Sequence, residues 1–476
     1  MLNVIGRPYI DSLVSHVPER ARLVLGGCRM VVTKVFWSYW YLAAERQAMF
    51  MKRTAGEPAP WTTDPILDSY RFTNAYRASD RVSQSLLQDV IYSGSYDCRD
   101  TILRVLLFKI FNRAETWQCL VDDVGQPSAA TFDRATYTAV LDRQFESDNR
   151  LYSGAYIMPA PQLGYERKHA NHIALLEQVL GDGTIEAITR ASSLHELYRE
   201  LLTIPSFGSF LAYQYAVDLN YSRHFEFDEM EFVVAGPGAL RGIEKCFADT
   251  RGLDPADVIR AMADSAEVYL ADSPVEFSDL WGRPLQLIDC QNLFCEVDKY
   301  ARVAHPDIGV GGPYRIKQTF RPDERPLRLG YPPKWGLPWS AEEPVEFGSG
   351  AENRKILSYF PTNRCYGVAM PDITEAATLP STKTPTSEHL DMIRELILSE
   401  LSRLRIDRNS IESAMGSGSD TRIPSRKAMV VIARVCKSLG VGNVVKKADL
   451  TPDQVTNVAN LIDLLARRTQ SKMAQA

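Results

Sequence analysis

Apolar residues recur at three- and four-residue spacing along most of the chain, the pattern of helices that bury one face. Apolar–polar alternation, typical of half-buried strands, is scarce, and no βαβ rhythm is present. The pattern predicts helices over residues 101–117, 132–147, 168–180, 183–190, 194–202, 209–219 and 254–264. Residues 1–55 and the stretch from 66 to 92 are also predicted to be helical. The sequence therefore predicts a mainly α fold.

Changes in composition divide this helical pattern into parts. A loop rich in Pro and Gly, from 305 to 339, ends the main domain near residue 340. Residues 341–388 are predicted to be a connecting segment, and residues 389–476 a small C-terminal helical module with helices near 389–405, 425–438 and 452–468. From residue 421 to the end there are ten Lys or Arg and three Asp or Glu, so the module is basic toward its end.

Composition excludes several classes of protein. Apolar residues make up 45% and charged residues 24% of the chain, as in soluble globular proteins. No apolar run approaches the roughly 18 to 20 residues that span a bilayer, and no signal peptide is evident, so we expect a cytoplasmic protein with no membrane partner. The eight cysteines form no C-x-x-C pair, which favours reduced thiols. No metal and no cofactor are predicted.

Two glycine-containing turns, each followed by a helix, suggest contacts with phosphate groups. The first, Ile204–Gly208, joins the helices predicted at 194–202 and 209–219, as in a helix-hairpin-helix. The second, Gly236–Gly242, opens another helix. Backbone N–H groups at such helix starts suit phosphates. Taken alone, the first turn is explained slightly better by an ordinary corner between two helices, and the net charge of −5 does not by itself favour a nucleic-acid partner.

Polar residues near these turns are candidates for chemistry. On a helix, Arg71, Asn74, Arg77 and Arg81 would share one face, which fits phosphate or base contact. Asp218, at the end of the helix after the first turn, could stabilise a developing positive charge, although a paired helix-end aspartate is about as probable a role. Asp228 is the rival carboxylate. No G-x-x-x-x-G-K-[ST], G-x-S-x-G or H-E-x-x-H motif is present, so a P-loop kinase is not predicted.

Five ordered segments resemble one known group of proteins. They are PWTTDPILDSYRFTNAYRASDR, IPSFGSFLAYQYAVDLNYS, FVVAGPGALRGIEK, CEVDKYAR and YPPKWG. Together they resemble the α-glutamyl/putrescinyl-thymine pyrophosphorylase group, a divergent branch of the helix-hairpin-helix DNA glycosylase superfamily that includes bacterial anti-phage DNA glycosylases. The resemblance covers roughly residues 30–340. It implies a glycosylase-like helical core that acts on 5-substituted pyrimidines in DNA.

The resemblance also implies site residues. The catalytic candidates are Asp218, Asn220 and Asp228; the usual spacing after the hairpin glycine gives Asp228, and Asp218 is the preferred residue. The DNA- or base-contacting candidates are Arg71, Asn74, Arg77, Ile204, Gly208, Gln214, Gly236, Gly238, Arg241, Lys299 and Tyr300.

The function implied is that of a monofunctional DNA glycosylase. It would flip out and excise a bulky 5-modified pyrimidine, such as glucosylated hydroxymethylcytosine or hypermodified thymine, from double-stranded phage DNA. It would leave an abasic site and serve anti-phage defence. Two alternatives stay open. One is a transferase that joins an amino acid or polyamine to phosphorylated 5-hydroxymethyluracil in DNA, and the other is a non-catalytic reader of modified DNA.

Overall fold

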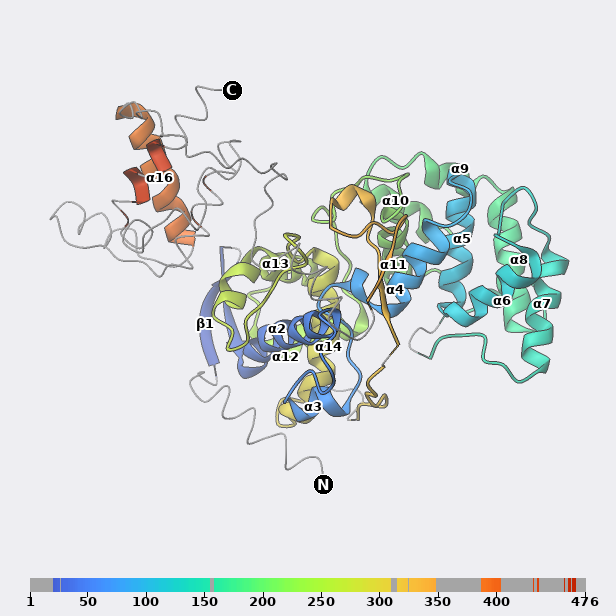
Figure 1. Cartoon of the computed structure of the whole chain (residues 1–476), viewed down its shortest axis with the longest axis horizontal. Coiled ribbons are helices and arrows are strands. Elements are labelled where there is room, and N and C mark those ends of the chain that lie inside the picture. Colours follow the sequence, from blue (N-terminus) through green and yellow to red (C-terminus); the bar gives the residue numbers. More distant parts are fainter. Residues whose placement is uncertain are drawn as a thin grey trace, which may run out of the picture. The chain divides into compact units, whose positions relative to one another are not determined.

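The computed structural model of this chain describes residues 20–25, 27–154, 158–309, 315–323, 325–347 and 387–403, with a few helical positions between 431 and 467. The chain divides into two units, Met1–Asn363 and Arg364–Ala476. Helices dominate the described residues of both units (Figure 1), so the prediction of a mainly α fold is confirmed. The helices expected at 425–438 and 452–468 lie largely outside the described residues.

The elements of the first unit follow in chain order. The helices are α2 (Lys34–Thr54), α3 (Pro65–Ser69), α4 (Arg81–Ser85), α5 (Cys98–Phe111), α6 (Ala114–Val124), α7 (Arg134–Glu146), α8 (Lys168–Gly181), α9 (Thr184–Thr189), α10 (Leu194–Leu202), α11 (Ser209–Asn220), α12 (Pro237–Cys246), α13 (Pro255–Ala271) and α14 (Leu287–Ala304). Short 3-10 or π turns are η1 (Arg77–Ser79), η2 (Leu86–Ile91) and η3 (Pro333–Trp335). The strands are β1 (Arg20–Leu25), β2 (Cys28–Thr33), β3 (Phe247–Asp249), β4 (Leu327–Leu329) and β5 (Val345–Phe347). In the second unit, α16 spans Ser387–Arg403.

The expectation that residues 1–55 are helical throughout is wrong. β1 and β2 form an antiparallel hairpin in the register Arg22↔Val31, and β3 adds to β2. Along β2 the side chains of Met30 and Val32 are buried on one face, the alternation of a strand with one covered side. The strand leads directly into α2, whose first turn is capped by the Thr33 hydroxyl accepting from the Val35 N–H.

The core of the first unit is built around α2 and α14. Most of α2 is buried, including Phe36, Tyr39, Trp40 and Tyr41, so its aromatic cluster packs inward. Trp40 stacks on Tyr269 of α13 at an interplanar angle of 14°. Burial of aromatic side chains of this size supplies a large share of the hydrophobic stabilisation of a core.

The helix predicted over 101–117 is two helices. α5 ends at Phe111; its C-cap residue, Asn112, adopts a left-handed conformation with φ of 51°, and α6 begins at Ala114. Asparagine tolerates this conformation better than most residues and is a common helix terminator. The helices predicted at 132–147, 168–180, 183–190 and 194–202 are confirmed within one or two residues.

The predicted hairpin of two helices is also present. α10 ends at Leu202 and α11 begins at Ser209. The residue with positive φ in the turn is Ser206 (70°), whereas Gly208, which precedes α11, has φ of −83°. The turn therefore does not depend on the conformational freedom of Gly208.

Glycines of α12 serve close packing against α14. A Cβ atom added at Gly242 would lie 2.1 Å from the carbonyl oxygen of Phe294, and one added at Gly238 would lie 3.0 Å from the sulfur of Cys295. Glycine at these positions lets the two helix backbones approach.

We expect Gly242→Ala to destabilise the protein by about 1–2 kcal/mol. Overpacking costs about 1–3 kcal/mol, and the obstacle here is backbone that cannot rotate away, whereas alanine gains at most about 1 kcal/mol of helix propensity. Urea unfolding measures the change. Gly181→Ala is the control, because Gly181 is also helical but has no atom within 4 Å of an added Cβ. Equal stability of the two variants would contradict the packing role.

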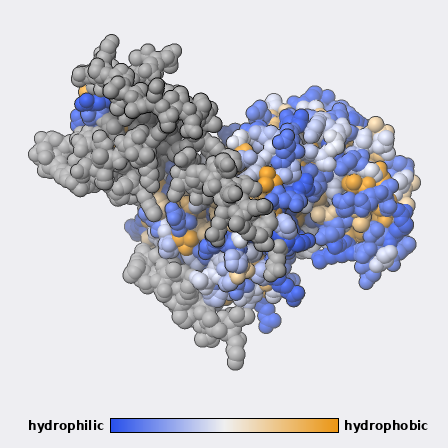
Figure 2. Space-filling model, in the orientation of Figure 1, coloured by the Kyte–Doolittle hydropathy of each residue, from blue (hydrophilic) through white to orange (hydrophobic). Residues whose placement is uncertain are grey.

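Hydrophilic side chains cover most of the visible surface of the first unit that is not drawn grey (Figure 2). None of the helices in the described ranges combines the length and apolar character that crossing a bilayer requires.

Candidate active site

Residues 70–80 follow irregular backbone apart from the short turn η1, so the helix expected between 66 and 92 is interrupted there. Helical backbone forms only before this segment, in α3, and after it, in α4 and η2. The Arg77 N–H donates to Asp289 of α14 at 2.7 Å, and the Asn74 N–H donates to Asp80 at 2.8 Å. These contacts replace the bonds that a helix would make. Burial raises the pKa of Asp289 to about 6, against the two N–H donors from Gln286 and Arg77 that lower it.

The four polar residues of this segment consequently do not share a face. Arg71 is exposed. The side-chain oxygen of Asn74 accepts from Arg46, and its amide nitrogen donates to the Ser79 carbonyl, so Asn74 fastens the segment. Arg77 points inward and is buried. The prediction of one exposed Arg/Asn stripe is therefore wrong.

Arg77 ends in a buried charge cluster with Asp218 and Lys109. Its Nη1 lies 2.6 Å from Asp218 Oδ1, and Lys109 Nζ lies 3.1 Å from Asp218 Oδ2. The Asp218 side chain is 0% exposed. Although burial acts to raise the pKa of Asp218, the two cations hold it below its usual value. In this conformation Asp218 balances two buried cations and presents no surface to a substrate.

A chain of side-chain amides extends from this cluster to α14. Arg77 Nε donates to Gln214 Oε1 at 3.2 Å, and Gln214 Nε2 donates to Gln291 Oε1 at 3.2 Å. Arg77 also donates to the hydroxyl of Tyr221 at 3.3 Å. The cluster thus links α5, α11, α14 and the 70–80 segment.

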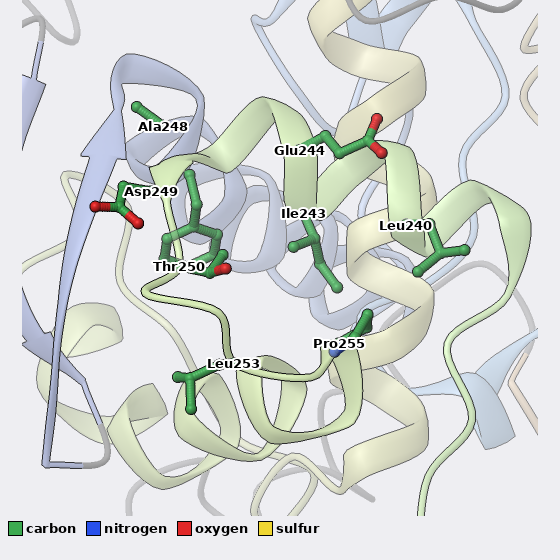
Figure 3. A pocket seen from close by; sticks show the side chains of 9 residues that line it. Leu240, Ile243, Glu244, Ala248, Asp249, Thr250, Leu253 and Pro255 are labelled. Carbon is green, nitrogen blue, oxygen red and sulfur yellow. The ribbon is translucent and has the colours of Figure 1, made fainter.

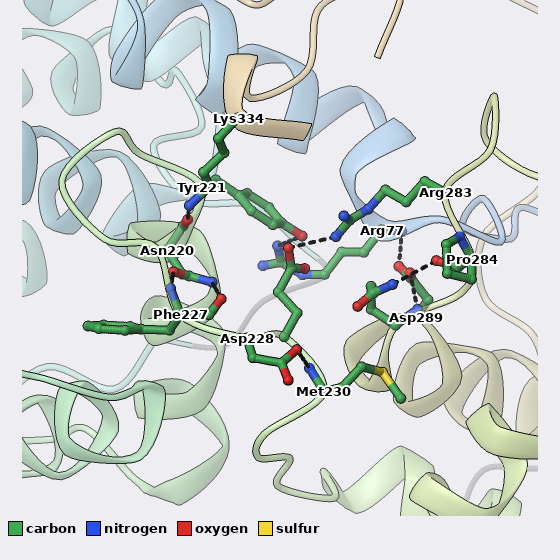
Figure 4. Close-up of polar contacts among 12 residues, drawn as sticks. Arg77, Asn220, Tyr221, Phe227, Asp228, Met230, Arg283, Pro284, Asp289 and Lys334 are labelled. Atoms are coloured by element: carbon green, nitrogen blue, oxygen red, sulfur yellow. Dashed lines mark hydrogen bonds and ion pairs between the residues drawn. The ribbon is translucent and has the colours of Figure 1, made fainter. Parts of the chain in front are cut away.

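Next to it lies a second ion pair that retains contact with solvent. Arg283 Nη2 is 2.6 Å from Glu229 Oε1, with the side chains 16% and 9% exposed. The Arg283 guanidinium stacks 3.6 Å from the centroid of Trp335, which meets Tyr221 edge to face. Figure 4 shows Arg77, Tyr221 and Arg283 pointing toward one another. This pair is the more accessible of the two charge clusters.

The side chains of the other two predicted catalytic residues, Asn220 and Asp228, form hydrogen bonds with backbone groups. Asn220 exchanges two hydrogen bonds of 3.0 Å with the backbone of Phe227 and so closes the loop after α11 (Figure 4). Asp228 is exposed, and its side chain accepts from the Met230 N–H two residues on. Lys334 donates to the carbonyls of Asn220 and Phe225 at the end of α11, and burial lowers its pKa to about 8.

The predicted contacts at the two glycine turns have packing roles in this structure. A Cβ added at Gly236 would lie 2.5 Å from the ring of Phe210, so the two turns lie against each other. Arg241 pairs with Asp298 at 3.2 Å. Ile204 is buried, and an added Cβ at Gly208 would meet open space. DNA contact at these positions stays a prediction.

Lys299 and Tyr300 anchor the segment before residue 72. Lys299 Nζ donates to the Arg71 carbonyl at 2.8 Å and pairs with Glu296 at 2.7 Å. Tyr300 is fully buried and donates to Asp64 at 2.6 Å. In this conformation Tyr300 has no surface that DNA could touch.

A surface hollow of about 420 Å³ lies between α12, β3 and the start of α13 (Figure 3). Its lining is Leu240, Ile243, Glu244, Phe247, Ala248, Asp249, Thr250, Leu253 and Pro255. None of the predicted site residues belongs to it.

Sequence reasoning missed Glu229, Arg283 and Trp335 as site residues. Glu229 is one of four acidic residues between positions 226 and 231, and nothing in the local sequence distinguishes it from the others. The cationic-aromatic segment YPPKWG was the signal for Trp335. Arg283 is more than 50 residues from Glu229 in the chain, so only folding pairs them.

Comparison with known proteins corrects the resemblance drawn from the motifs. No solved structure matches the chain. The 5-hmdU DNA kinase of Bacillus phage SP10 is 25% identical over 290 residues, which cover 56% of this chain and 45% of the relative. The chain therefore spans about half the length of the relative that it matches.

A family comparison identifies the helical part of the chain. Residues 33–310 match the family described as 5-hmdU DNA kinase, helical domain. The assignment to the pyrophosphorylase and glycosylase group is wrong, and so is hydrolysis of an N-glycosidic bond, with the base excision and anti-phage defence derived from it, because the matched family is named for a phosphotransferase. The alternative that involved phosphorylated 5-hydroxymethyluracil came closer. With more than half of its residues matched, this chain belongs to the family of 5-hmdU DNA kinase helical domains.

Proposed function

We propose that this chain takes part, as a phosphotransferase, in phosphorylating the hydroxymethyl group of 5-hydroxymethyl-2′-deoxyuridine in DNA. Support comes from the family match over residues 33–310 and from the named activity of the phage relative. Because the chain spans about half of that relative, the activity, the DNA substrate and a phage-related setting are all part of the proposal.

The reaction sets requirements that a site must meet. The hydroxymethyl oxygen forms a bond to phosphorus while the bond from phosphorus to the donor oxygen breaks, and the hydroxyl proton must go to a base. A carboxylate can accept that proton, and a guanidinium group can stabilise the charge on the transferred phosphoryl group. The site therefore needs a carboxylate and a cation within reach of the substrate.

The Glu229–Arg283 pair is the observation that carries the proposal. Three carboxylates are candidates: Asp218, Asp228 and Glu229. Asp218 is fully buried between two cations, and Asp228 accepts a hydrogen bond within an exposed turn. Glu229 is also largely buried, but 9% of its side chain is exposed, beside a guanidinium group that is 16% exposed. We assign Glu229 the role of proton acceptor and Arg283 that of phosphoryl-group contact.

The test is incubation of the protein with ATP, Mg²⁺ and a duplex that contains one 5-hydroxymethyl-2′-deoxyuridine. We expect the modified nucleoside to gain the mass of one phosphoryl group by mass spectrometry after digestion, and the matched thymidine duplex to stay unchanged. A modified duplex of unchanged mass would contradict the proposal.

A second candidate is the transfer of an amine onto an already phosphorylated 5-hydroxymethyluracil. The observation that favours it is the partly exposed Arg283 guanidinium, which points toward the buried Arg77 (Figure 4), since a guanidinium group can bind phosphate with two parallel hydrogen bonds. Supplied with phosphorylated DNA and an amino acid or polyamine, the protein would then replace the phosphate with the amine. The same mass measurement separates the two reactions.

A further inference from the structure

Four exposed cations lie along two neighbouring segments of the first unit, away from the Glu229–Arg283 pair in the sequence. They are Arg71, Arg315, Lys317 and Arg321, which we call the basic track. All four side chains are exposed, and no ion pair is found for any of them among the described residues.

The backbone under the basic track is fixed. The Arg71 N–H donates to the Gln318 carbonyl at 3.1 Å, and the Phe320 N–H donates to the Ser69 carbonyl at 3.0 Å. An antiparallel bridge joins Tyr70 to Thr319 between them. The segment from 315 to 321 is therefore tied to the segment before the Arg77 cluster.

Side chains on both sides of the basic track hold it further. Lys299 Nζ donates to the Arg71 carbonyl, and Arg302 Nη1 donates to the Arg315 carbonyl at 3.4 Å. Ile316 and Phe320 pack against the core, with Phe320 edge-on to Trp61. Ile316 and Phe320 are half-buried, whereas Arg315, Lys317 and Arg321, at alternate positions beside them, are exposed to solvent.

The surroundings of the basic track add positive charge. Arg53 lies over the ring of Trp61, at 5.7 Å from its centroid. Burial is the largest cause that lowers the pKa of Arg53, and nearby Arg325 and Arg81 lower it as well. Asp323 offsets part of this charge, but it is already paired with Arg325 at 2.6 Å. Asp68, exposed on α3, lies three residues before Arg71 in the sequence.

We propose that the basic track binds the phosphate backbone of the DNA substrate, without reading its sequence or its modification. In extended backbone the six steps from Arg315 to Arg321 cover at most about 20 Å. A DNA strand presents a phosphate about every 3.4 Å of helix axis, so this length meets several phosphates. The inference rests on the proposed function for the identity of the substrate, and it adds the surface that holds it.

Salt dependence tests this role. Each phosphate contact contributes about 0.9 to the slope of log affinity against log salt concentration. The double variant Lys317→Gln, Arg321→Gln should therefore bind with a slope about 1.8 smaller than wild type. This decrease in slope should be equal for a duplex that contains 5-hydroxymethyl-2′-deoxyuridine and for the matched thymidine duplex. Fluorescence anisotropy titrations at a series of NaCl concentrations measure the slope for each duplex.

The matched control removes two exposed cations elsewhere. Arg22 and Arg29 lie exposed on the β1–β2 hairpin, and Arg22→Gln, Arg29→Gln should leave the slope at its wild-type value. The inference would be overturned if the double variant of the basic track kept the wild-type slope. It would also be overturned if the slope decreased only for the modified duplex. If the wild type binds neither duplex, the inference and the proposed function both fail. If it binds both duplexes with the expected slope change but phosphorylates neither, the proposed function alone fails.

Discussion

Replacing Glu229 with glutamine should lower the rate of phosphorylation of 5-hydroxymethyl-2′-deoxyuridine in DNA by roughly 10²- to 10⁴-fold, the usual contribution of a positioned proton acceptor. Glutamine keeps an oxygen that can accept from Arg283, now 2.6 Å from the carboxylate, but it cannot take a proton. The loss should therefore appear in kcat, with the affinity for DNA changed only a few-fold. Single-turnover rates and anisotropy titrations measure the two quantities separately.

Asp228→Asn is the control for this result. Asp228 is the next residue in the chain and carries the same charge, but it is exposed and serves a turn. We expect the Asp228→Asn variant to phosphorylate the DNA at a rate within a few-fold of the wild-type rate. If Asp228→Asn lost as much activity as Glu229→Gln, the charge of the loop would explain the effect and the specific role of Glu229 would be refuted.

Replacing Asp218 with alanine should destabilise the protein by about 3–5 kcal/mol, because a buried charge that loses its partner is costly. Arg77 and Lys109 would both remain buried while their shared carboxylate is gone. Denaturant unfolding at neutral pH measures the free energy. An Asp228→Ala variant, which removes an exposed carboxylate, should change it by less than about 1 kcal/mol.

The same cluster predicts a dependence on pH. Because the pKa of Asp218 is lowered in the folded protein, its contribution to stability is present at neutral pH and is lost as pH falls through the folded pKa. Wild type should therefore lose more stability than Asp218→Asn between pH 5 and the acid range, measured as the difference in unfolding free energy. If the unfolding free energies of wild type and Asp218→Asn fell in parallel as the pH is lowered, the assignment of this ion pair would be contradicted.

Most of the helices of this fold follow from the sequence within each segment. The helices from 132 to 202 and the hairpin at 203–208 followed from the spacing of apolar residues and from Pro205. The split of the 101–117 helix depended on one residue, Asn112, in a left-handed conformation. The β1–β2 hairpin was missed because only a few residues of β2 alternate before α2 begins.

The site was less accessible to prediction than the fold. Arg77, Gln214 and Asp218 were among the predicted residues, and the structure brings them together, although as a buried cluster. Lys109, a partner that decides the role of Asp218, comes from α5, another part of the chain. The motifs that suggested a glycosylase were interpreted as a family signature, and the family match over residues 33–310 replaced that assignment.

The sequence alone determined that this protein is mainly helical, because helix formation depends on the periodicity of apolar residues within a segment. Only the tertiary structure decided which carboxylate is fully enclosed and which keeps a small exposed fraction. The burial and pairing of Asp218 and Glu229 depend on cations supplied by distant segments, such as Lys109 and Arg283. In the same way, the bond from Arg77 to Asp289 joins residues 212 positions apart, and it overrode the helical pattern of the segment in which Arg77 lies.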